Sequence, residues 1–335
     1  MKALAVVGKV LQERPVGGAL TTMAIVLVLT FSLISVARSK VKPSNDFLGS
    51  AETTAGRLIT DGRQIFRFDT FGDEAFWGGQ LRLDQAVAQL SPRQALDLGL
   101  KVDSAVLPAS VIQAIRRGRI NLDDPAVTLQ LLKLHAVIGV VGFFNSEGAL
   151  SSIGLTCAIC HSTVDNSVAM GIGNRIDGLA NRDLNVGAIA AAAPNLQPFV
   201  DMLKIVDNGV DDTKVRTILH SWGPGKFDAE LFLDGKEFQP DGRAAATLIP
   251  NARGLAGFNL HTWTGGWGTI PYWNAFVAVD SLHGVGTFFD ARFDDATQFP
   301  IGAALHLGHV STDPDNDRVT SKLPALHFYQ LALPS

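Results

Sequence analysis

The sequence predicts a mainly α-helical protein with long irregular loops, preceded by one transmembrane helix. Three observations support this prediction. Several segments start with a helix-capping residue and end at a glycine, 33 glycines are combined with 15 prolines, and an uncharged apolar run lies near the N-terminus. Caps and terminal glycines mark the ends of helices, and the remaining glycines indicate irregular connections between them.

The composition is that of a protein with a large core and no nucleic-acid partner. Of the 335 residues, 47% are hydrophobic and 18% are charged, and the formal net charge is −4. The length exceeds that of one average domain, although a single large domain is compatible with it. The slightly acidic balance provides no basic surface of the kind that binds nucleic acid.

The N-terminal segment has the pattern of a membrane anchor. A leader with three basic residues precedes residues 19–36, which carry no charge. Eighteen helical residues extend about 27 Å, near the thickness of the hydrocarbon core of a bilayer. The alternative is a long signal peptide with a cleavage site at residues 35–37. We favour an anchor, because the leader is long and the apolar run exceeds the core of a usual signal peptide.

These features predict the following organisation. The chain divides into a cytoplasmic N-terminus at 1–18, a transmembrane anchor at 19–37 that contacts the lipid bilayer, a tether at 38–56, and a folded domain at 57–335.

Within the folded domain, capping residues and apolar spacing predict a series of helices. Ser91 with Pro92, and Asp124 with Pro125, place an N-cap residue before a proline at the first helical position. Gly99 and Gly118 are expected to end two of the helices. We expect helices near 56–67, 92–98, 108–117, 125–138, 186–193, 198–206 and 320–333.

Two features within these segments allow a core or a functional interpretation. The run from Phe66 to Trp77 is the densest aromatic stretch of the chain, and it is either core or the wall of a pocket. His135 lies among leucines, where a buried core histidine is the simpler interpretation and a metal ligand is the alternative.

The motif that carries chemistry is Cys157-Ala158-Ile159-Cys160-His161, in which the chain's only two cysteines lie three residues apart and a histidine follows. C-x-x-C-H is the attachment signal for c-type haem. On one helical turn, both thiols can form thioethers to the haem vinyl groups, and His161 is placed to bind the iron as its proximal ligand.

Thiol redox chemistry and zinc binding fit the motif less well. A thioredoxin-like redox pair needs a βαβ context, which the surrounding sequence lacks. A zinc site needs further thiolates or a second histidine at metal-ligand spacing. We therefore expect one covalent haem c, with iron bound by His161.

Together these features resemble a cytochrome c, and more narrowly the large, single-haem bacterial cytochromes related to the di-haem cytochrome c peroxidases. The matching segments are 66–74, 154–162, 221–228, 260–265 and 323–330. The resemblance implies a cytochrome c-like domain over 57–335. In that fold a helix with Gly62 and Phe66 crosses a C-terminal helix with Leu323, Leu326 and Tyr329, and the haem lies between them and the ligand loop.

A bound haem assigns expected roles to further residues. Arg175 and Arg182 follow the motif and are candidate partners of the haem propionates, since guanidinium groups bind carboxylates bidentately; surface ion pairs are the alternative. For the distal side of the iron we expect His261, then Met202, then His283. His261 is ranked first because the related peroxidases have their distal loop at this place. The glycine- and tryptophan-rich stretch 239–276 is expected to be a loop that folds over the haem edge.

The expected function is that of a membrane-anchored periplasmic c-type cytochrome that carries single electrons. Haem c is attached on the outer face of the bacterial inner membrane, so residues 38 onward are expected in the periplasm. The partner would be another redox protein, or a respiratory or photosynthetic membrane complex. The chain has one C-x-x-C-H, whereas the di-haem peroxidases use two haems in an internal relay, so the resemblance favours transfer over peroxidase activity.

Two alternatives remain at this point. The first is a haem peroxidase or oxygenase with an open distal site, in which Glu74, Trp263 or His261 would be the acid–base group. The second is a haem-based sensor, for which the sequence has no recognisable output domain. Calcium binding at Asp313, Asp315 and Asp317 is not favoured, because Arg318 and Pro324 occupy the sixth and twelfth positions of an EF-hand loop.

Overall fold

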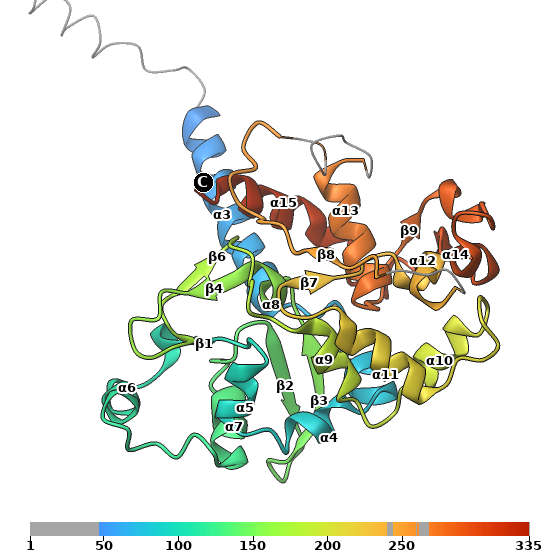
Figure 1. The fold of residues 1–335 in the computed structure, drawn as a ribbon. Coiled ribbons are helices and arrows are strands. Elements are labelled where there is room, and N and C mark those ends of the chain that lie inside the picture. Colours follow the sequence, from blue (N-terminus) through green and yellow to red (C-terminus); the bar gives the residue numbers. More distant parts are fainter. Residues whose placement is uncertain (1–46, 240–243, 259, 261–267, 335) are drawn as a thin grey trace, which may run out of the picture. The chain divides into compact units, whose positions relative to one another are not determined.

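The structure is a computed structural model that describes residues 47–239, 244–258, 260 and 268–334. The chain divides into two units, Met1–Thr54 and Ala55–Ser335. The second unit contains the motif and its surroundings, and the fold described below is that of this unit (Figure 1). The first unit is described from residue 47, where helix α3 (Phe47–Phe68) begins.

The predicted fold class, a mainly α cytochrome c-like domain after one transmembrane helix, is wrong. About 46% of the structure is helical and short strands are also present. Within the described part of the chain, these strands form five two-stranded sheets. No described helix is long and apolar enough to cross a membrane. The longest, α3, spans 22 residues, but it carries charged residues along its length, among them Glu52, Arg57 and Arg63. The predicted anchor at 19–37 and its leader lie outside the described residues.

The residues before and including the motif form a helical region around one hairpin. The elements are α3, a π-helical turn Ala75–Gln80, α4 (Leu83–Val87), α5 (Pro92–Asp97), β1 (Val102–Asp103), a 3₁₀ turn Ser104–Val106, α6 (Ala109–Arg116), α7 (Pro125–Lys133), β2 (Val140–Phe144), β3 (Leu150–Leu155) and α8 (Ala158–His161). Strands β2 and β3 pair in antiparallel register, from Val140 opposite Leu155 to Phe144 opposite Leu150.

The residues after the motif alternate short strands and helices. They are β4 (Ser162–Val164), β5 (Ile172–Gly173), β6 (Arg175–Asp177), α9 (Val186–Ala191), α10 (Gln197–Leu203), α11 (Asp212–Ser221), β7 (Lys226–Phe227), α12 (Leu231–Asp234), a 3₁₀ turn Lys236–Phe238, β8 (Thr247–Leu248), α13 (Ile270–Phe276), a π-helical turn Val277–Ser281, β9 (Phe288–Phe289), a 3₁₀ turn Ala291–Asp294, α14 (Pro300–Ala304), β10 (His309–Val310), a 3₁₀ turn Thr320–Lys322 and α15 (Leu323–Ala332). Strand β4 pairs with β6, which holds the chain just after the motif.

The predicted helix starts are confirmed where a cap was recognised. The side chain of Ser91 accepts a hydrogen bond from the Gln94 amide, and the Gln94 side chain accepts one from the Ser91 amide, which forms a capping box before α5. Asp124 caps α7 in a similar way, through the amide of Ala126. Capping residues therefore determine where these helices begin.

The expectation of a loop over 239–276 is wrong at its end, because α13 occupies 270–276. The hairpin β2–β3 is a feature that the sequence analysis does not contain. The described part of the expected tether, 47–56, is helical, because α3 begins at Phe47. The expectation of a buried core histidine at position 135 is wrong: His135 is exposed, has a left-handed backbone with φ of 52°, and lies edge-on to Phe68.

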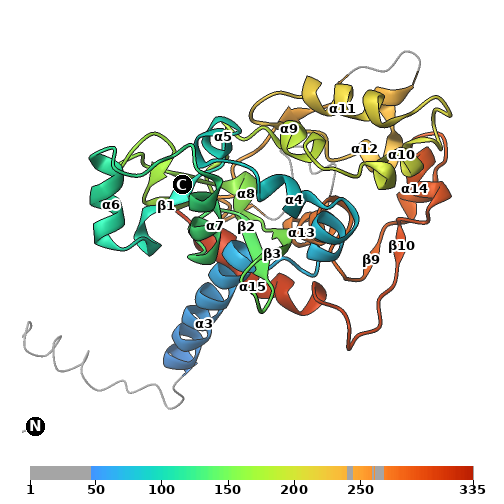
Figure 2. The same ribbon diagram turned by 90° about the horizontal axis from the view of Figure 1, so that it is seen from below.

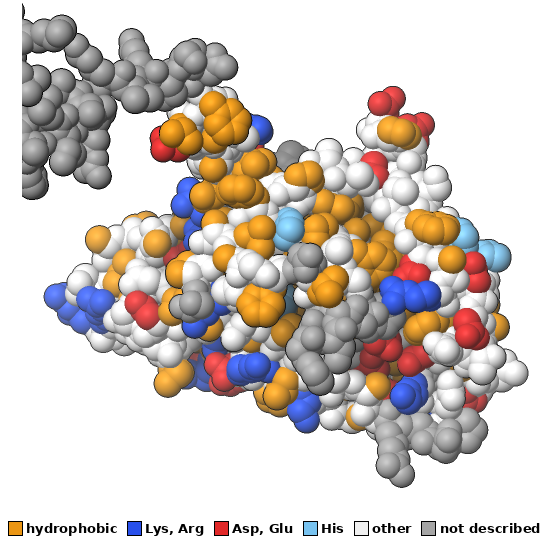
Figure 3. Space-filling model, turned by 90° about the horizontal axis from the view of Figure 1, so that it is seen from above, with side chains coloured by type: hydrophobic (Ala, Val, Ile, Leu, Met, Phe, Trp, Pro, Cys, Tyr) orange, Lys and Arg blue, Asp and Glu red, His pale blue; other side chains and the backbone are white. Residues whose placement is uncertain are grey.

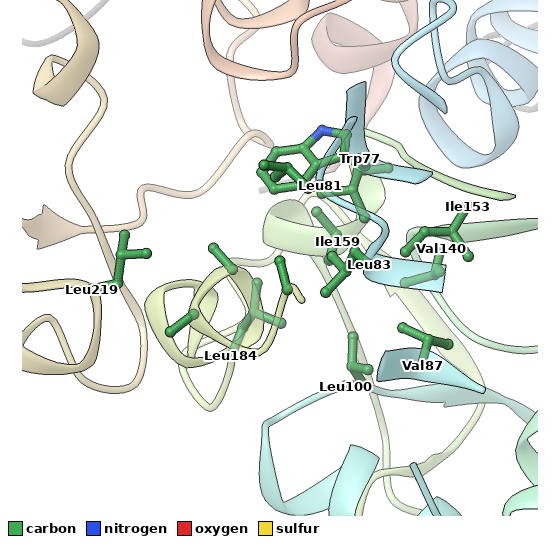
Figure 4. Close-up of a cluster of buried hydrophobic side chains, with 14 of the residues drawn as sticks. Trp77, Leu81, Leu83, Val87, Leu100, Val140, Ile153, Ile159, Leu184 and Leu219 are labelled. Atoms are coloured by element: carbon green, nitrogen blue, oxygen red, sulfur yellow. The ribbon is translucent and has the colours of Figure 1, made fainter. Parts of the chain in front are cut away.

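The core consists of two clusters of buried apolar side chains. The first cluster draws on α4, α5, α7, the hairpin, α9, α10 and α11, and Figure 4 shows part of it around Ile159. The second cluster is built mainly from α3, α13, the β9 region and α15. Ala158 belongs to the second cluster and Ile159 to the first, so the turn α8 lies where the two clusters meet.

The helix crossing implied by the resemblance is present in the described structure. At Gly62 of α3, an added Cβ atom would lie 2.0 Å from the carbonyl oxygen of Ala325 and 2.6 Å from Cβ of Tyr329. One turn later, the ring of Phe66 meets that of Tyr329 edge-on, with centroids 5.6 Å apart. Figures 1 and 2 show α15 lying across α3. This close contact requires a residue without a side chain at position 62.

Candidate functional site

The C-x-x-C-H motif forms one helical turn, as its spacing predicts. Cys157 is the N-cap of α8 and His161 is its last residue. The His161 amide donates to the Cys157 carbonyl oxygen at 3.2 Å. Cys157 packs against the second apolar cluster and Cys160 against the first. Both thiols and the imidazole therefore project from one turn between the two halves of the core.

Segments distant in sequence fix the backbone of this turn. The hydroxyl of Thr156 donates to the carbonyl oxygen of Arg67, at the end of α3, at 3.2 Å. On the other side, the Gly178 amide donates to the His161 carbonyl oxygen at 2.7 Å, and the Asn181 amide donates to that of Cys160 at 2.8 Å. These bonds anchor both ends of the turn.

Gly139 allows the hairpin to approach the turn closely. A Cβ atom at this position would lie 2.2 Å from the amide nitrogen and Cα of Ile159, and its φ is +80°. Any other residue would both clash with the turn and adopt a strained backbone. The amide of Thr156 donates to the Gly139 carbonyl oxygen at 3.1 Å, which completes the contact.

The imidazole of His161 is oriented by a backbone carbonyl group. Its Nδ1 lies 3.0 Å from the carbonyl oxygen of Pro250. A carbonyl oxygen only accepts hydrogen bonds, so Nδ1 is the donor in this contact. Metal-binding histidines are commonly held in this way, with the second ring nitrogen donating to a carbonyl group. Nε2 is then the ring nitrogen through which a metal would bind.

The surroundings of the two thiols do not favour thiolate chemistry. Both cysteines are half-buried and are not joined by a disulfide. Burial raises the pKa of the Cys157 thiol to about 12, and burial likewise raises the pKa of Cys160 to about 12. Reactive cysteines of redox pairs have a lowered pKa instead. The structure therefore gives no support to a C-x-x-C redox pair.

A buried carboxyl group supports the strand that leads into the turn. Asp73 is fully buried, and each of its carboxyl oxygens lies 3.1 Å from the amide nitrogen of Leu155. Burial raises the pKa of Asp73 to about 9; the hydrogen bond from the Leu155 amide opposes this shift, and the nearby Glu74 and Asp69 contribute to it. At neutral pH the Asp73 carboxyl group is therefore protonated.

A second carboxyl group joins three elements just behind the motif. Asp177 of β6 accepts hydrogen bonds from the Ser162 hydroxyl at 2.8 Å, from Arg67 Nε at 2.6 Å and from the Tyr329 hydroxyl at 2.6 Å. Its side chain is 2% exposed. These bonds connect β4, α3 and α15, so the residue after His161 is tied to the helix crossing.

The two arginines proposed as propionate partners lie in different environments. The side chain of Arg175 is 2% exposed, and its Nε lies 3.1 Å from Oδ2 of Asp103. Its guanidinium group lies over the Phe68 ring, 5.5 Å from the centroid, and neither Nε nor Nη1 makes a hydrogen bond within the described structure. Arg182 is exposed. The structure therefore provides Arg175 with a partner inside the protein, whereas Arg182 faces solvent.

The predicted distal ligands cannot all be located. His261 and the acid–base candidate Trp263 lie outside the described residues. Met202, on α10, is partly buried against the first apolar cluster, and α10 lies apart from α8 in Figures 1 and 2. Glu74 accepts from the Thr70 hydroxyl at 2.6 Å and pairs with Arg318 at 3.2 Å.

His283 is part of an aromatic group in the core. Its ring stacks on that of Phe76 with centroids 3.7 Å apart, and the Phe232 ring lies edge-on at 5.8 Å. Burial lowers the pKa of His283 to about 4, so the ring is neutral. Its Nε2 is buried and has no hydrogen-bond partner among the described residues. These contacts show a neutral core histidine, and the identity of the distal ligand remains a prediction.

Apolar side chains reach the surface beside the loop that contacts His161. Leu248, Phe258 and Leu260, which flank the Pro250 segment in sequence, are 60%, 66% and 50% exposed. The face seen in Figure 3 is largely apolar at its centre, with charged side chains towards both sides.

The described residues contain no cluster of three or more histidine, cysteine or acidic side chains that could hold a metal ion. In the Asp313–Asp315–Asp317 segment, the Asp317 carboxylate accepts hydrogen bonds from the amides of Val319 and Thr320. It thus serves as a local turn residue.

Comparisons with protein-family models, curated proteins and solved structures found no match for this chain. The interpretation of the site therefore depends on the chemistry of its own residues. Two thiols on one helical turn, followed by an imidazole whose Nδ1 contacts a backbone carbonyl oxygen, are the residues that a covalently attached haem requires. The residues present fit this group.

Sequence reasoning missed Pro250, Gly139 and the supporting carboxyl groups of Asp73 and Asp177. The expectation that 239–276 folds over the haem edge did not identify Pro250, although the described part of this stretch does contact His161. The contact joins residues 89 apart in sequence, and spacing gives no indication of such a pair.

Proposed function

We propose that this protein is a c-type cytochrome that carries single electrons through one covalently bound haem. Cys157 and Cys160 would hold the haem through thioether bonds, and His161 would bind its iron from the proximal side. The observation that supports this proposal most strongly is the hydrogen bond from His161 Nδ1 to the Pro250 carbonyl oxygen. This bond orients an imidazole next to the two thiols.

The haem would supply a one-electron iron couple, and the chain's own residues would bind and tune it. The Pro250 carbonyl group increases the basicity of the His161 ring. The apolar clusters on both sides of the turn would shield part of the bound group from water, and nearby charges would then influence its potential more strongly. Arg182, if it pairs with a propionate, would partly neutralise that group.

Electron transfer is favoured over peroxide chemistry because the chain has a single attachment motif. The expected partner is a soluble redox protein or a membrane-bound respiratory or photosynthetic complex. Because haem c is attached outside the cytoplasm, we place the domain on the periplasmic side of the bacterial inner membrane. The exposed apolar residues Leu248, Phe258 and Leu260 provide a surface of the kind on which a transient partner docks.

Covalent attachment is tested by expressing the full chain in cells that attach haem c, and by staining for haem after denaturing electrophoresis. The wild-type protein should retain the stain, and Cys157→Ala and Cys160→Ala together should lose it. Met170→Ala, at a residue that is 80% exposed, is the matched control and should retain the stain. Equal staining of the double cysteine variant would show that the haem is not attached at this turn.

A further inference from the structure

The first apolar cluster contains a cavity of about 40 Å³. It lies among α4, α5, α7, the hairpin β2–β3 and α9, with Ile159 of the motif forming one wall. Figure 4 labels several of the lining residues within the cluster, among them Val87, Leu100, Val140 and Ile159. The cavity is therefore inside the core, on the first-cluster side of the turn.

The cavity offers no hydrogen-bond partner to water. Two lining residues have polar side chains, Thr128 and Lys101, and both are engaged elsewhere. The Thr128 hydroxyl donates to the Leu90 carbonyl oxygen at 2.6 Å, and Lys101 Nζ lies 2.5 Å from Oδ2 of Asp183. A buried water needs two to four polar partners, and cavities lined by apolar side chains stay dry but admit apolar ligands.

The volume limits the size of the occupant. A cavity needs a volume of about 10–15 Å³ to hold one water molecule, whereas a cavity that admits benzene has a volume of about 150 Å³. A cavity of about 40 Å³ lies between these values. It has room for one small apolar molecule and excludes an aromatic ring.

We propose that this cavity is a binding site for a single small apolar molecule, of the class of dioxygen and other dissolved diatomic gases. Ile159 lies between the two cysteines in the motif, so the bound molecule is held directly behind the turn that carries them. The proposal depends on the cavity alone and goes beyond the proposed electron transfer. A protein that lacks haem would still contain the site.

Xenon is the probe for the test, because it is apolar, monatomic and inert. Methyl groups of the full-chain protein are followed by NMR under increasing xenon pressure. The methyl signals of Val87, Leu100 and Ile159 should shift as the xenon pressure increases and should reach a plateau when the site is filled. Those of Val319 and Leu326, which are equally buried in the second cluster, should not shift.

Three variants locate the site. Ala95→Val adds two methyl groups to a lining residue and should abolish the shifts. Ala126→Val makes the same change at an exposed position of α7 and should preserve them. Leu131→Ala enlarges the cavity and should admit benzene, which the wild-type protein excludes.

The proposal is overturned if the wild-type methyl signals do not respond to xenon, or if they respond equally in Ala95→Val. If Ala95→Val fails to fold, the test depends on Leu131→Ala. A Leu131→Ala protein that does not bind benzene would contradict the proposed cavity. Haem staining of the same samples is independent of either result, so a failure of this proposal is distinguishable from a failure of the proposed function.

Discussion

At the scale of single residues, the interpretation depends on the pairing of His161 with Pro250. A histidine that binds metal needs one ring nitrogen for the metal and a fixed partner for the other. The 3.0 Å contact from Nδ1 to the Pro250 carbonyl oxygen provides that partner. Burial raises the pKa values of the two thiols, which disfavours thiolate chemistry at this turn.

Replacing His161 should remove the proximal ligand while both attachment cysteines remain. We expect His161→Ala to lose the sharp reduced absorbance band of six-coordinate haem c, because the iron loses an axial nitrogen. His220→Ala changes an exposed histidine of α11 and serves as the control. Identical reduced spectra for His161→Ala and the wild-type protein would contradict the assignment of His161.

Asp73 should make folding stability dependent on pH. Burial raises its pKa from 3.8 to about 9, so the folded state holds this proton more tightly than the unfolded state does. The stability linked to this proton is fully present below the unfolded pKa and is lost as the pH rises towards the folded value. Between roughly pH 4 and pH 9 the free energy of unfolding should fall by up to about 1.4 kcal/mol per pH unit from this group.

The measurement is the free energy of unfolding of Asp73→Asn relative to wild type at several pH values. Asparagine keeps an oxygen for the Leu155 amide and does not titrate, so the difference between the two proteins should shift in favour of the variant as the pH rises. The buried His283 has the opposite dependence below about pH 6.5, but it is present in both proteins and cancels. If the difference in free energy of unfolding between Asp73→Asn and the wild-type protein stayed constant across this pH range, the Asp73 carboxyl group would not have the raised pKa.

At the scale of elements, the crossing of α3 and α15 depends on one glycine. In Gly62→Ala the new Cβ would lie 2.0 Å from the Ala325 carbonyl oxygen, so the helices would have to separate. We expect a loss of about 1–3 kcal/mol in the free energy of unfolding, typical of overpacking.

Gly56→Ala is the matched control on the same helix. A Cβ atom at position 56 meets nothing within 4 Å, and alanine favours a helix over glycine by up to about 1 kcal/mol. Chemical denaturation of the two variants should therefore show effects of opposite sign. A destabilisation of the same size at both positions would mean that the crossing is not tight at Gly62.

Helices could be predicted from the sequence wherever a local signal marks their ends. Ser91 before Pro92 and Asp124 before Pro125 are such signals, and both cap helices in the structure. The hairpin β2–β3 was missed, although the turn residues between Phe144 and Leu150 include Asn145 and Gly148 and could have indicated it. The short strands β1, β4, β5 and β6 could not be predicted, because two or three residues carry no alternating pattern.

The motif residues of the site could be predicted from the sequence, whereas the residues that hold the motif in place could not. Cys157, Cys160 and His161 are contiguous, so their spacing alone places them on one turn. The residues that hold this turn, such as Gly139, Asp177 and Pro250, come from distant parts of the chain and have no motif of their own. The distal side is determined by tertiary contacts as well, and His261 lies outside the described residues.

At the scale of the whole second unit, two apolar clusters meet at the attachment turn. The segment between Phe66 and the motif, whose role the sequence did not reveal, supplies α4, α5, α7 and the hairpin, and thus much of the first cluster. That cluster is imperfectly packed: a cavity of about 40 Å³ costs roughly 1 kcal/mol by the usual relation between volume and stability. Ala95→Val should recover part of this energy while it blocks the gas site.

The measurement that tests the central claim most directly is an absorbance spectrum of the purified, dithionite-reduced full-length protein, recorded before and after addition of carbon monoxide. We predict the sharp α band of haem c and no change with carbon monoxide, because a carrier of single electrons keeps both axial positions of its iron occupied. A carbon monoxide-induced shift of the Soret band would reveal an open distal site and favour the peroxidase or oxygenase alternative. Absence of the α band in protein made by cells that attach haem c would contradict the central claim, and the Cys157–Cys160 turn would then need another function.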